Sequence, residues 1–264
     1  MFVGMTIVFA ITLIALFADL IAPFDPRAIG VPFQRPNDVH ILGTNDIGND
    51  IFSELVYGAR YSILTGFVAM CISSVIGVLI GTVSGMFGGN VDSVLMKLTS
   101  FVYTIPYLPL LIVLSMFMRG SLMTTALIIG FISWPEMARV LRAQTIKIMN
   151  SEYVSVIKIM GAGKVYLFRK HVFRELLPLI AHRAVYRFRT AIIAESSLSF
   201  LGLAASTVKS WGTMLFFAQA RNAFLTDAWL WWVIPPGLLI FALSLGLTLI
   251  AYSLESKIDP RLEG

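Results

Sequence analysis

Six long apolar stretches alternate with polar segments along the chain. They lie at about residues 2–21, 62–87, 91–118 and 121–140, within 176–203, and within 229–254. Each approaches or exceeds the roughly 20 apolar residues that a helix needs to cross the hydrocarbon of a bilayer. The pattern predicts an all-α integral membrane protein with six transmembrane helices.

Composition excludes a water-soluble globular domain. Apolar residues make up 57% of the chain and charged residues 13%, against about 45–50% and about 25% in ordinary globular domains. The mean hydropathy is +0.82. The protein is therefore expected in a lipid bilayer. Its net charge of +5 is explained by basic cytoplasmic loops and does not require a nucleic-acid partner.

Positive charges are unevenly distributed. Of the 20 Lys and Arg residues, 11 lie in residues 139–189, and the positive-inside rule places this stretch in the cytoplasm. With six spans, both termini are then cytoplasmic, and residues 23–58 and roughly 204–228 face outside. The first apolar stretch lacks a preceding basic region and a small-residue cleavage site, so we expect a membrane span and no cleavable signal peptide.

Glycines and prolines indicate how two of the spans are shaped. The second span carries three glycines spaced four residues apart on one helix face: Gly77, Gly81 and Gly85. We expect this face to pack closely on another helix. Pro106 and Pro109 should kink the third span. Kinks in membranes are tolerated where neighbours or a water-filled path satisfy the freed carbonyls, so the stretch from Tyr103 to Pro109 is a candidate pathway lining.

An amphipathic pattern marks the basic segment between the fourth and fifth stretches. Apolar residues recur at helical spacing on both sides of a Gly-Ala-Gly sequence: Val156, Ile159 and Met160 before it, Val165, Phe168 and Val172 after it. The pattern predicts two short amphipathic helices joined at the glycines. An exposed apolar ridge on a cytoplasmic loop needs a partner, and the pattern alone leaves a lipid surface and a protein groove equally open.

The order of the motifs resembles a known family. Glu152 lies nine residues before Gly161, and a Leu-Pro pair ends at Pro178, as in the EAA loop of ABC importer permeases. Further segments resemble the C-type subunit of the dipeptide/oligopeptide/nickel branch: HILGTNDIGND at 40–50, YGARYS at 57–62, AESSLSFLG at 194–202, SWGTM at 210–214 and IDPRL at 258–262. The resemblance covers nearly the whole chain.

The resemblance implies one subunit of an importer in the inner (plasma) membrane of a prokaryote. Such a permease pairs with a homologous second permease, two cytoplasmic ATP-binding subunits and an extracytoplasmic substrate-binding protein. The EAA loop, about residues 150–172 here, is the coupling helix that sits in a groove of an ATPase subunit. By the match, the coupling positions are Glu152, Val156, Ile159, Met160, Gly161, Ala162 and Val165. A rigid element joined to two spans can transmit a rigid-body motion.

The same resemblance sets the expected chemistry and organisation. The chain has no GxxxxGK[ST] phosphate loop, so it is not expected to be an enzyme. ATP and Mg should be bound by partner subunits, with no cofactor in this chain. Residues 1–58 should form an N-terminal transmembrane helix and an extracytoplasmic segment, and residues 59–264 a permease core with five transmembrane helices.

Several functions remain open at this point. Short peptides are the expected cargo, with nickel or a nickel–chelator complex as the alternative within the same branch. A secondary transporter or channel acting alone would predict inverted internal repeats, which are not visible. A membrane-embedded hydrolase would need a catalytic group that nothing in the chain supplies.

The chain departs from the family pattern at three places. Val156 and Ile157 replace the small residues of the Glu-Ala-Ala run, and Asn49 stands where the outer motif usually carries Arg. Residues 182–189 (HRAVYRFR) replace a small and apolar stretch. The first two changes leave the family assignment intact and bear only on individual contacts.

The arginines of this last stretch, including Arg183 and Arg187, should not face lipid. A charge at the centre of a bilayer costs from about 2.5 to over 10 kcal/mol. They extend below the hydrocarbon, pair with carboxylates, or line the pathway and attract anionic groups of the substrate. The candidate carboxylates are Glu136, Glu175 and Glu195.

Other titratable and sulfur-containing residues suggest no metal or catalytic centre. The three histidines are far apart in the sequence, so no metal site is predicted, and the methionines near 116–123 are interpreted as packing residues. Glu195 is open to two interpretations, a proton carrier or a structural or gate residue. The candidate pathway residues are Tyr103, Pro106, Arg183, Arg187, Glu195 and Ser196.

Overall fold

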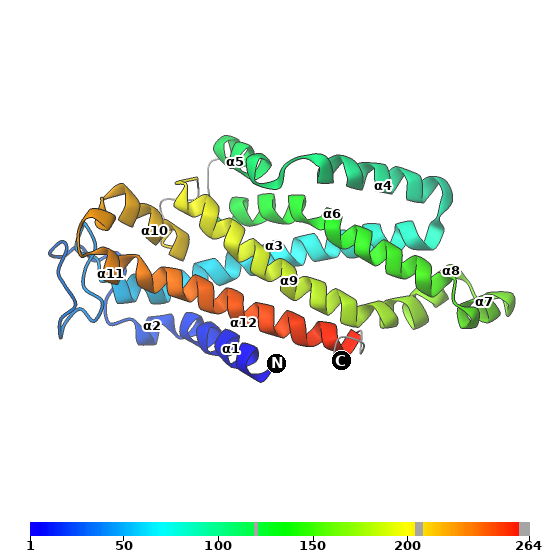
Figure 1. Ribbon diagram of the computed structural model, residues 1–264, viewed down its shortest axis with the longest axis horizontal. Coiled ribbons are helices and arrows are strands. Elements are labelled where there is room, and N and C mark those ends of the chain that lie inside the picture. The colour runs from blue at the N-terminus through cyan, green and yellow to red at the C-terminus, as the bar shows by residue number, and fades with distance from the viewer. Residues whose placement is uncertain (119–120, 204–207, 259–264) are drawn as a thin grey trace.

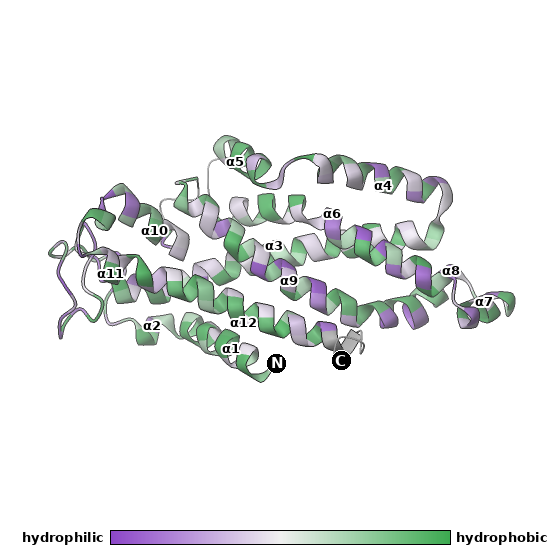
Figure 2. Cartoon of the chain, viewed as in Figure 1, coloured by the Kyte–Doolittle hydropathy of each residue, from purple (hydrophilic) through white to green (hydrophobic). Residues whose placement is uncertain are grey.

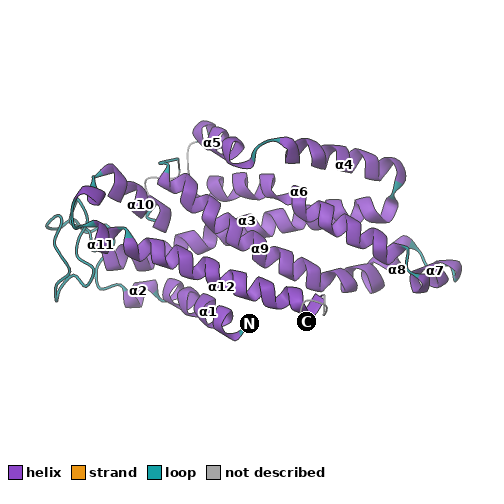
Figure 3. Ribbon diagram, in the orientation of Figure 1, coloured by secondary structure: helices purple, strands orange, loops and turns teal. Residues whose placement is uncertain are grey.

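A computed structural model of the protein describes residues 1–118, 121–203 and 208–258. Within these ranges the regular secondary structure is helical (Figure 3), and one isolated antiparallel bridge joins Thr44 and Asp50. The long helices follow the long axis of an elongated bundle (Figure 1). The predicted all-α class is confirmed. The part of the IDPRL motif that follows Ile258 lies outside the described residues.

Four long helices form the centre of the bundle. The elements are α1 (Phe2–Leu16), α2 (Ala18–Ile21), α3 (Ile51–Phe87), α4 (Gly89–Thr104), α5 (Tyr107–Phe117), α6 (Leu122–Met149), α7 (Glu152–Ile159), α8 (Lys164–Leu167), a π-helical turn (Phe168–Val172), α9 (Phe173–Phe200), α10 (Trp211–Ala220), a 3₁₀ turn (Ala223–Leu225), α11 (Trp229–Trp232) and α12 (Ile234–Ile258). α3 packs against α6 and α9, and α12 packs against α9 and α1. α4 and α5 lie along one side of the bundle and α1 and α2 along the other (Figure 1).

The second predicted span corresponds to α3, and this helix starts earlier in the chain than the hydropathy pattern predicts. The side chain of Asp50 accepts a hydrogen bond from the backbone N–H of Ser53 at 2.8 Å and so caps α3. The predicted polar segment at 23–58 therefore ends at residue 50. The expected boundary between residues 58 and 59 falls inside α3. Sequence polarity was misleading here because Ser53 and Glu54 are buried against the preceding loop rather than exposed in it.

The glycine face of α3 packs directly on α6. A Cβ atom added to Gly81 would lie 2.5 Å from the carbonyl oxygen of Ala138, and one added to Gly85 would lie 2.6 Å from Cβ of Thr145. Gly130 of α6 meets Ile72 of α3 in the same way. The predicted close packing is confirmed, because only glycine lets the two backbones approach this closely.

The predicted kink in the third apolar stretch is also confirmed. The axes of α4 and α5 differ by 83°. Ile105 is extended, as expected for a residue before proline, and Pro106 is the N-cap of α5. Pro109 lies in the first turn of α5, where its missing N–H would have no helical partner.

Length and hydropathy alone identify fewer spans than six. Among the described helices, α3 and the α11–α12 stretch are each long and apolar enough to cross a membrane, and the bent α4–α5 pair adds a third if it counts as one span. α6 and α9 have 28 residues each but are too polar by this measure. α1 is apolar but has 15 residues.

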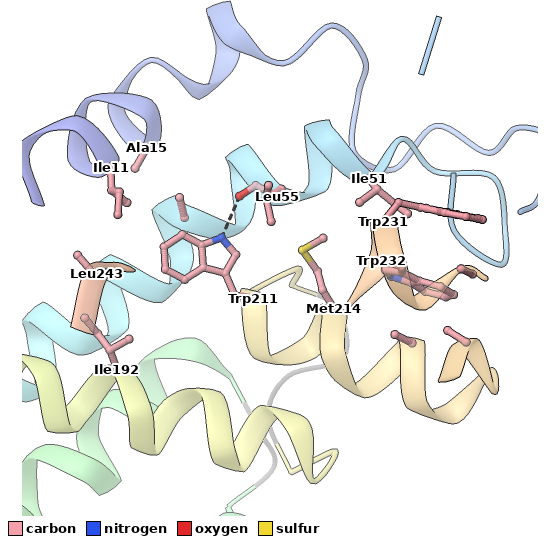
Figure 4. Close-up of a cluster of buried hydrophobic side chains, with 14 of the residues drawn as sticks. Ile11, Ala15, Ile51, Leu55, Ile192, Trp211, Met214, Trp231, Trp232 and Leu243 are labelled. Carbon is pink, nitrogen blue, oxygen red and sulfur yellow. Dashed lines mark hydrogen bonds between the residues drawn. The ribbon is translucent and has the colours of Figure 1, made fainter. Parts of the chain in front are cut away.

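A large apolar cluster lies where α10 and α11 meet α1, α3 and α12 (Figure 4). Trp211 is fully buried in it, and its indole N–H donates to the carbonyl oxygen of Leu55 at 3.0 Å. Ile192 of α9 and Leu243 of α12 pack from the other side. This cluster fixes the end of the bundle opposite α7.

Candidate functional site

An exposed apolar ridge lies on α7, which projects from one end of the bundle (Figure 1). Val154 is fully buried against the end of the bundle. Val156, Ile159 and Met160 are 56%, 86% and 81% exposed. The helical spacing thus separates residues that pack on the bundle, Val154 and Ile157, from a largely exposed ridge. The exposed Glu152 begins the same helix.

The break after α7 requires glycine. Gly161 has a φ of +90°, a conformation that residues with a Cβ atom rarely adopt. The backbone N–H of Ala162 donates to the carbonyl oxygen of Ile157 at 3.2 Å, which closes the turn. Val165, just beyond the break, is again exposed. The predicted coupling positions therefore lie together at this tip of the molecule.

The second of the two predicted short helices, which follows the glycines, is not separate from the long helix after it. α8 continues through the π-helical turn into α9. Of its predicted apolar stripe, Val165 is exposed, Phe168 is half-buried and Val172 is fully buried in the cluster that contains Leu141 and Leu176. The expectation of an isolated amphipathic helix was wrong on this side, because no helix-breaking residue separates residue 164 from α9.

Two polar contacts fix α7 to the long helices. The hydroxyl of Tyr153 donates to the carboxylate of Glu175 on α9. Burial and this carboxylate raise the pKa of Tyr153 to about 12. On the other side, Nζ of Lys158 donates to the carbonyl oxygen of Met149, the last residue of α6, at 2.7 Å. The loop is thus attached to the ends of both α6 and α9.

A cavity of about 420 Å³ lies where the break between α4 and α5 faces α6 and α9. It is lined by Val102, Tyr103, Thr104, Ile105, Pro106, Tyr107, Ile132, Ser133, Pro135, Glu136, Tyr186, Arg187 and Thr190. Its volume falls in the range of about 300–1,000 Å³ typical of small-molecule sites. Of the predicted pathway residues, the structure brings Tyr103, Pro106 and Arg187 together here.

Beside this cavity, two arginine side chains form ion pairs with one carboxylate. Nη2 of Arg187 lies 2.7 Å from Oε2 of Glu136, and Nη1 of Arg183 lies 3.5 Å from Oε1 of the same group. Of the three candidate carboxylates, Glu136 is therefore the partner. Arg187 therefore both pairs with a carboxylate and lines the cavity. Arg189 is separate and donates to Thr248 of α12 at 3.0 Å.

Glu195 and Ser196 lie elsewhere and do not line the cavity. The fully buried carboxylate of Glu195 accepts hydrogen bonds from the hydroxyls of Ser199 and Ser210, each at 2.7 Å. The hydroxyl of Ser196 is 3.4 Å from the same carboxylate. Because Ser210 caps α10, Glu195 links α9 to the start of α10.

Sequence reasoning missed part of the cavity wall. Tyr107, Ser133 and Thr190 line it, and the hydroxyl of Tyr107 lies 3.3 Å from that of Ser133. Their positions depend on the bend between α4 and α5, which a linear pattern does not give. The available signal was Pro135 followed by Glu136 in an apolar stretch, because ionisable residues in membrane helices mark functional sites. No group of three metal-ligating side chains occurs among the residues that the structure describes.

Comparisons with known proteins identify similar chains. Residues 77–264 match the family described as binding-protein-dependent transport system inner membrane component. The dipeptide transport system permease protein DppC of Haemophilus influenzae is 33% identical, with 99% of this chain and 90% of the relative covered. The oligopeptide transport system permease protein OppC of Bacillus subtilis is 30% identical, with 98% and 85% covered.

The fold has a counterpart among solved structures. An inward-facing structure of the MetNI methionine ABC transporter contains a chain that superposes with a TM-score of 0.60 at 16% identity. The match covers 76% of this chain and 96% of that chain. At this identity the likeness concerns the fold alone.

Proposed function

Because this chain belongs to the family of binding-protein-dependent transport system inner membrane components, we propose that it is the permease subunit of an ATP-driven importer of dipeptides and oligopeptides. Its relatives in Haemophilus influenzae and Bacillus subtilis are named for dipeptide and oligopeptide transport. Those names favour peptides over nickel or a metal chelate as the cargo.

Six spans with both termini in the cytoplasm complete this proposal. The spans are α1–α2, α3, α4–α5, α6, α9 and α12. The polarity of α6 and α9 is compatible with a bilayer because Glu136 pairs with Arg183 and Arg187 between them. The N-terminus and the last turns of α12 lie away from the residue 22–50 loop (Figure 1). The basic stretch at 139–189 supports a cytoplasmic location for the α7 end.

The coupling positions then have a direct mechanical role. The ridge of Val156, Ile159, Met160 and Val165 would be buried in a groove of a cytoplasmic ATPase subunit that binds ATP and Mg. Because α7 is fixed to the ends of α6 and α9, a movement of the ATPase would displace both helices together. These two helices form walls of the cavity, so the motion would open or close it.

Two further partners complete the proposed transporter. A homologous second permease would complete the pathway, of which this chain supplies half. A substrate-binding protein would deliver peptides at the end formed by residues 22–50 and α10. Residues 59–264 would form the permease core. This division assigns function and does not mark a structural boundary, since residue 58 is inside α3.

The observation that carries the proposal is the exposed ridge on a loop fixed to both cavity helices. The test is ATP-dependent import by the complete complex, reconstituted in proteoliposomes with its binding protein, of a tripeptide library quantified by mass spectrometry. We expect import only when ATP reaches the ATPase side. If the complex imported a radioactive nickel chelate but no peptides, the metal alternative would be favoured. Import at full rate without ATPase subunits would favour a secondary transporter and contradict the proposal.

A further inference from the structure

Two arginines share one carboxylate beside the cavity. Two guanidinium groups, those of Arg183 and Arg187, share the single carboxylate of Glu136. Among the residues that line the cavity, Glu136 and Arg187 are the charged ones. These two charges balance each other, and Arg183, which is not among the lining residues but contacts Glu136 at 3.5 Å, adds one positive charge in excess. In a region of low dielectric, two guanidinium groups that share one carboxylate favour any further carboxylate that reaches them.

Both arginines also have unused hydrogen-bonding capacity. The Nε atoms of Arg183 and Arg187 are buried and have no acceptor among the described residues. A guanidinium carries five N–H donors in a planar fork that matches a carboxylate through two parallel hydrogen bonds. Glu136 meets Arg187 through one short contact only, so the fork is incompletely occupied.

The two sides of this ion pair differ in how accessible they are. The side chain of Arg187 is 10% exposed, whereas that of Glu136 is 38% exposed. Arg187 is thus held in the wall of the cavity by its surroundings, and Glu136 approaches it from the open side. A solute in the cavity meets both groups, because both line it.

We propose that Arg187, assisted by Arg183, is the carboxylate-binding site of the pathway, and that Glu136 occupies it until the C-terminal carboxylate of a peptide takes its place. This inference rests on the proposed function and adds how the cargo is recognised. When the peptide carboxylate binds the arginines, the released Glu136 can pair with the peptide ammonium group. The exchange conserves charge, since a zwitterion replaces one internal ion pair by two external ones.

The experiment compares two tripeptide libraries in the complete reconstituted transporter, one with free C-terminal carboxylates and one with C-terminal amides. For the wild-type complex, kcat/KM for ATP-dependent import should favour the free acids. In Arg187→Gln this preference, expressed as the ratio of the two kcat/KM values, should fall at least tenfold. The binding protein is identical in both complexes, so its own selectivity cancels in the comparison.

Two further variants keep the test decisive. Glu136→Gln removes the competing carboxylate but also the partner of the peptide ammonium group, so KM should fall several-fold for N-acetylated free acids, which lack that ammonium group, and stay within twofold for N-acetylated amides. Arg189→Gln is the matched control, because Arg189 bonds Thr248 away from the cavity, and its acid-to-amide ratio should equal that of the wild type. If the wild type imports peptides but neither Arg187→Gln nor Glu136→Gln alters the selectivity, the carboxylate site is wrong and the peptide permease stands. If the wild type imports neither library, both fail.

Discussion

At the end of the bundle formed by residues 22–50 and α10, a carboxylate is buried among groups that satisfy it, whereas at the α7 end large apolar side chains stand in the open. Glu54 is 1% exposed and accepts from Nζ of Lys209 at 2.8 Å and from the amide of Asn45 at 3.0 Å. Ile159 is 86% exposed. The buried carboxylate is satisfied within the chain, whereas the apolar ridge at the other end is left exposed.

The two ends also differ in whether their large apolar side chains are already buried within the chain. Burying an apolar side chain such as Ile159 is worth about 1.5–3 kcal/mol, and that free energy is available at the α7 end only if another molecule covers the ridge. At the opposite end, Trp211 and its neighbours have already been removed from solvent (Figure 4). The apolar colouring of α7 in Figure 2 lies outside the bundle. The apolar cluster around Trp211 is therefore completed within the chain, whereas the ridge on α7 can be buried only by a partner.

The largest effect on the free energy of unfolding is expected in the buried apolar cluster around Trp211. Trp211→Ala should lower the free energy of unfolding by about 3–5 kcal/mol, since it leaves a cavity in a fully buried cluster and removes the donor to Leu55. Thermal unfolding in detergent measures the loss. The control is Leu225→Ala, at a side chain 83% exposed, which should stay within about 0.5 kcal/mol of the wild type. Equal effects of the two variants would contradict the contrast between buried and exposed positions.

A smaller effect, on binding rather than stability, is expected at the ridge. Ile159→Asp should weaken association with the ATPase subunits about ten- to a hundredfold, because it removes an apolar side chain from the interface. Co-purification from detergent at graded protein concentrations measures this loss. Unfolding should be unchanged, since the side chain of Ile159 is 86% exposed.

A matched control exists at the other end of the molecule. Ile29 is 81% exposed, so Ile29→Asp makes the same chemical change at nearly the same exposure. ATPase association should be unaffected by it. If both isoleucine variants release the ATPases, the loss reflects general destabilisation and the ridge has no special part in assembly.

The features that could be predicted from the sequence are those set by local geometry. The face of Gly77, Gly81 and Gly85 follows from helical periodicity, and the close packing follows from the missing Cβ atoms. Pro106 breaks a helix wherever it lies in the interior. The exposed ridge on α7 was predictable for the same reason, because alternation of apolar and charged residues directly reports the face of a short helix.

The features that escaped prediction depend on contacts between distant segments. Glu54 is polar by sequence and yet buried, because Lys209, distant from it in sequence, folds against it. The cavity wall of Tyr107, Ser133 and Thr190 depends on the 83° bend and on how α9 crosses α6. The pairing of Glu136 with two arginines was one of three open alternatives, since hydropathy does not choose between carboxylates. The functional roles of ridge and cavity stay predictions.

The smallest expected effect concerns the contact that holds α7 to α9. Tyr153→Phe removes the hydroxyl that donates to Glu175 and should reduce stability by about 0.5–1.5 kcal/mol. Because burial and Glu175 raise the pKa of Tyr153 to about 12, the folded protein holds this proton more tightly than the unfolded chain does. The stabilisation is then fully present below the ordinary tyrosine pKa of about 10 and is lost as the pH rises towards 12.

Wild type and Tyr153→Phe should therefore differ in stability at pH 8 and converge above pH 12, as followed by unfolding in detergent. Absorbance titration should show one tyrosine fewer ionising at the high-pH end in the variant. ATPase association should weaken far less than in Ile159→Asp, because Lys158 still bonds the end of α6 and the ridge is intact. A loss of association as large as that of Ile159→Asp would mean that the attachment of α7, rather than its apolar surface, determines assembly.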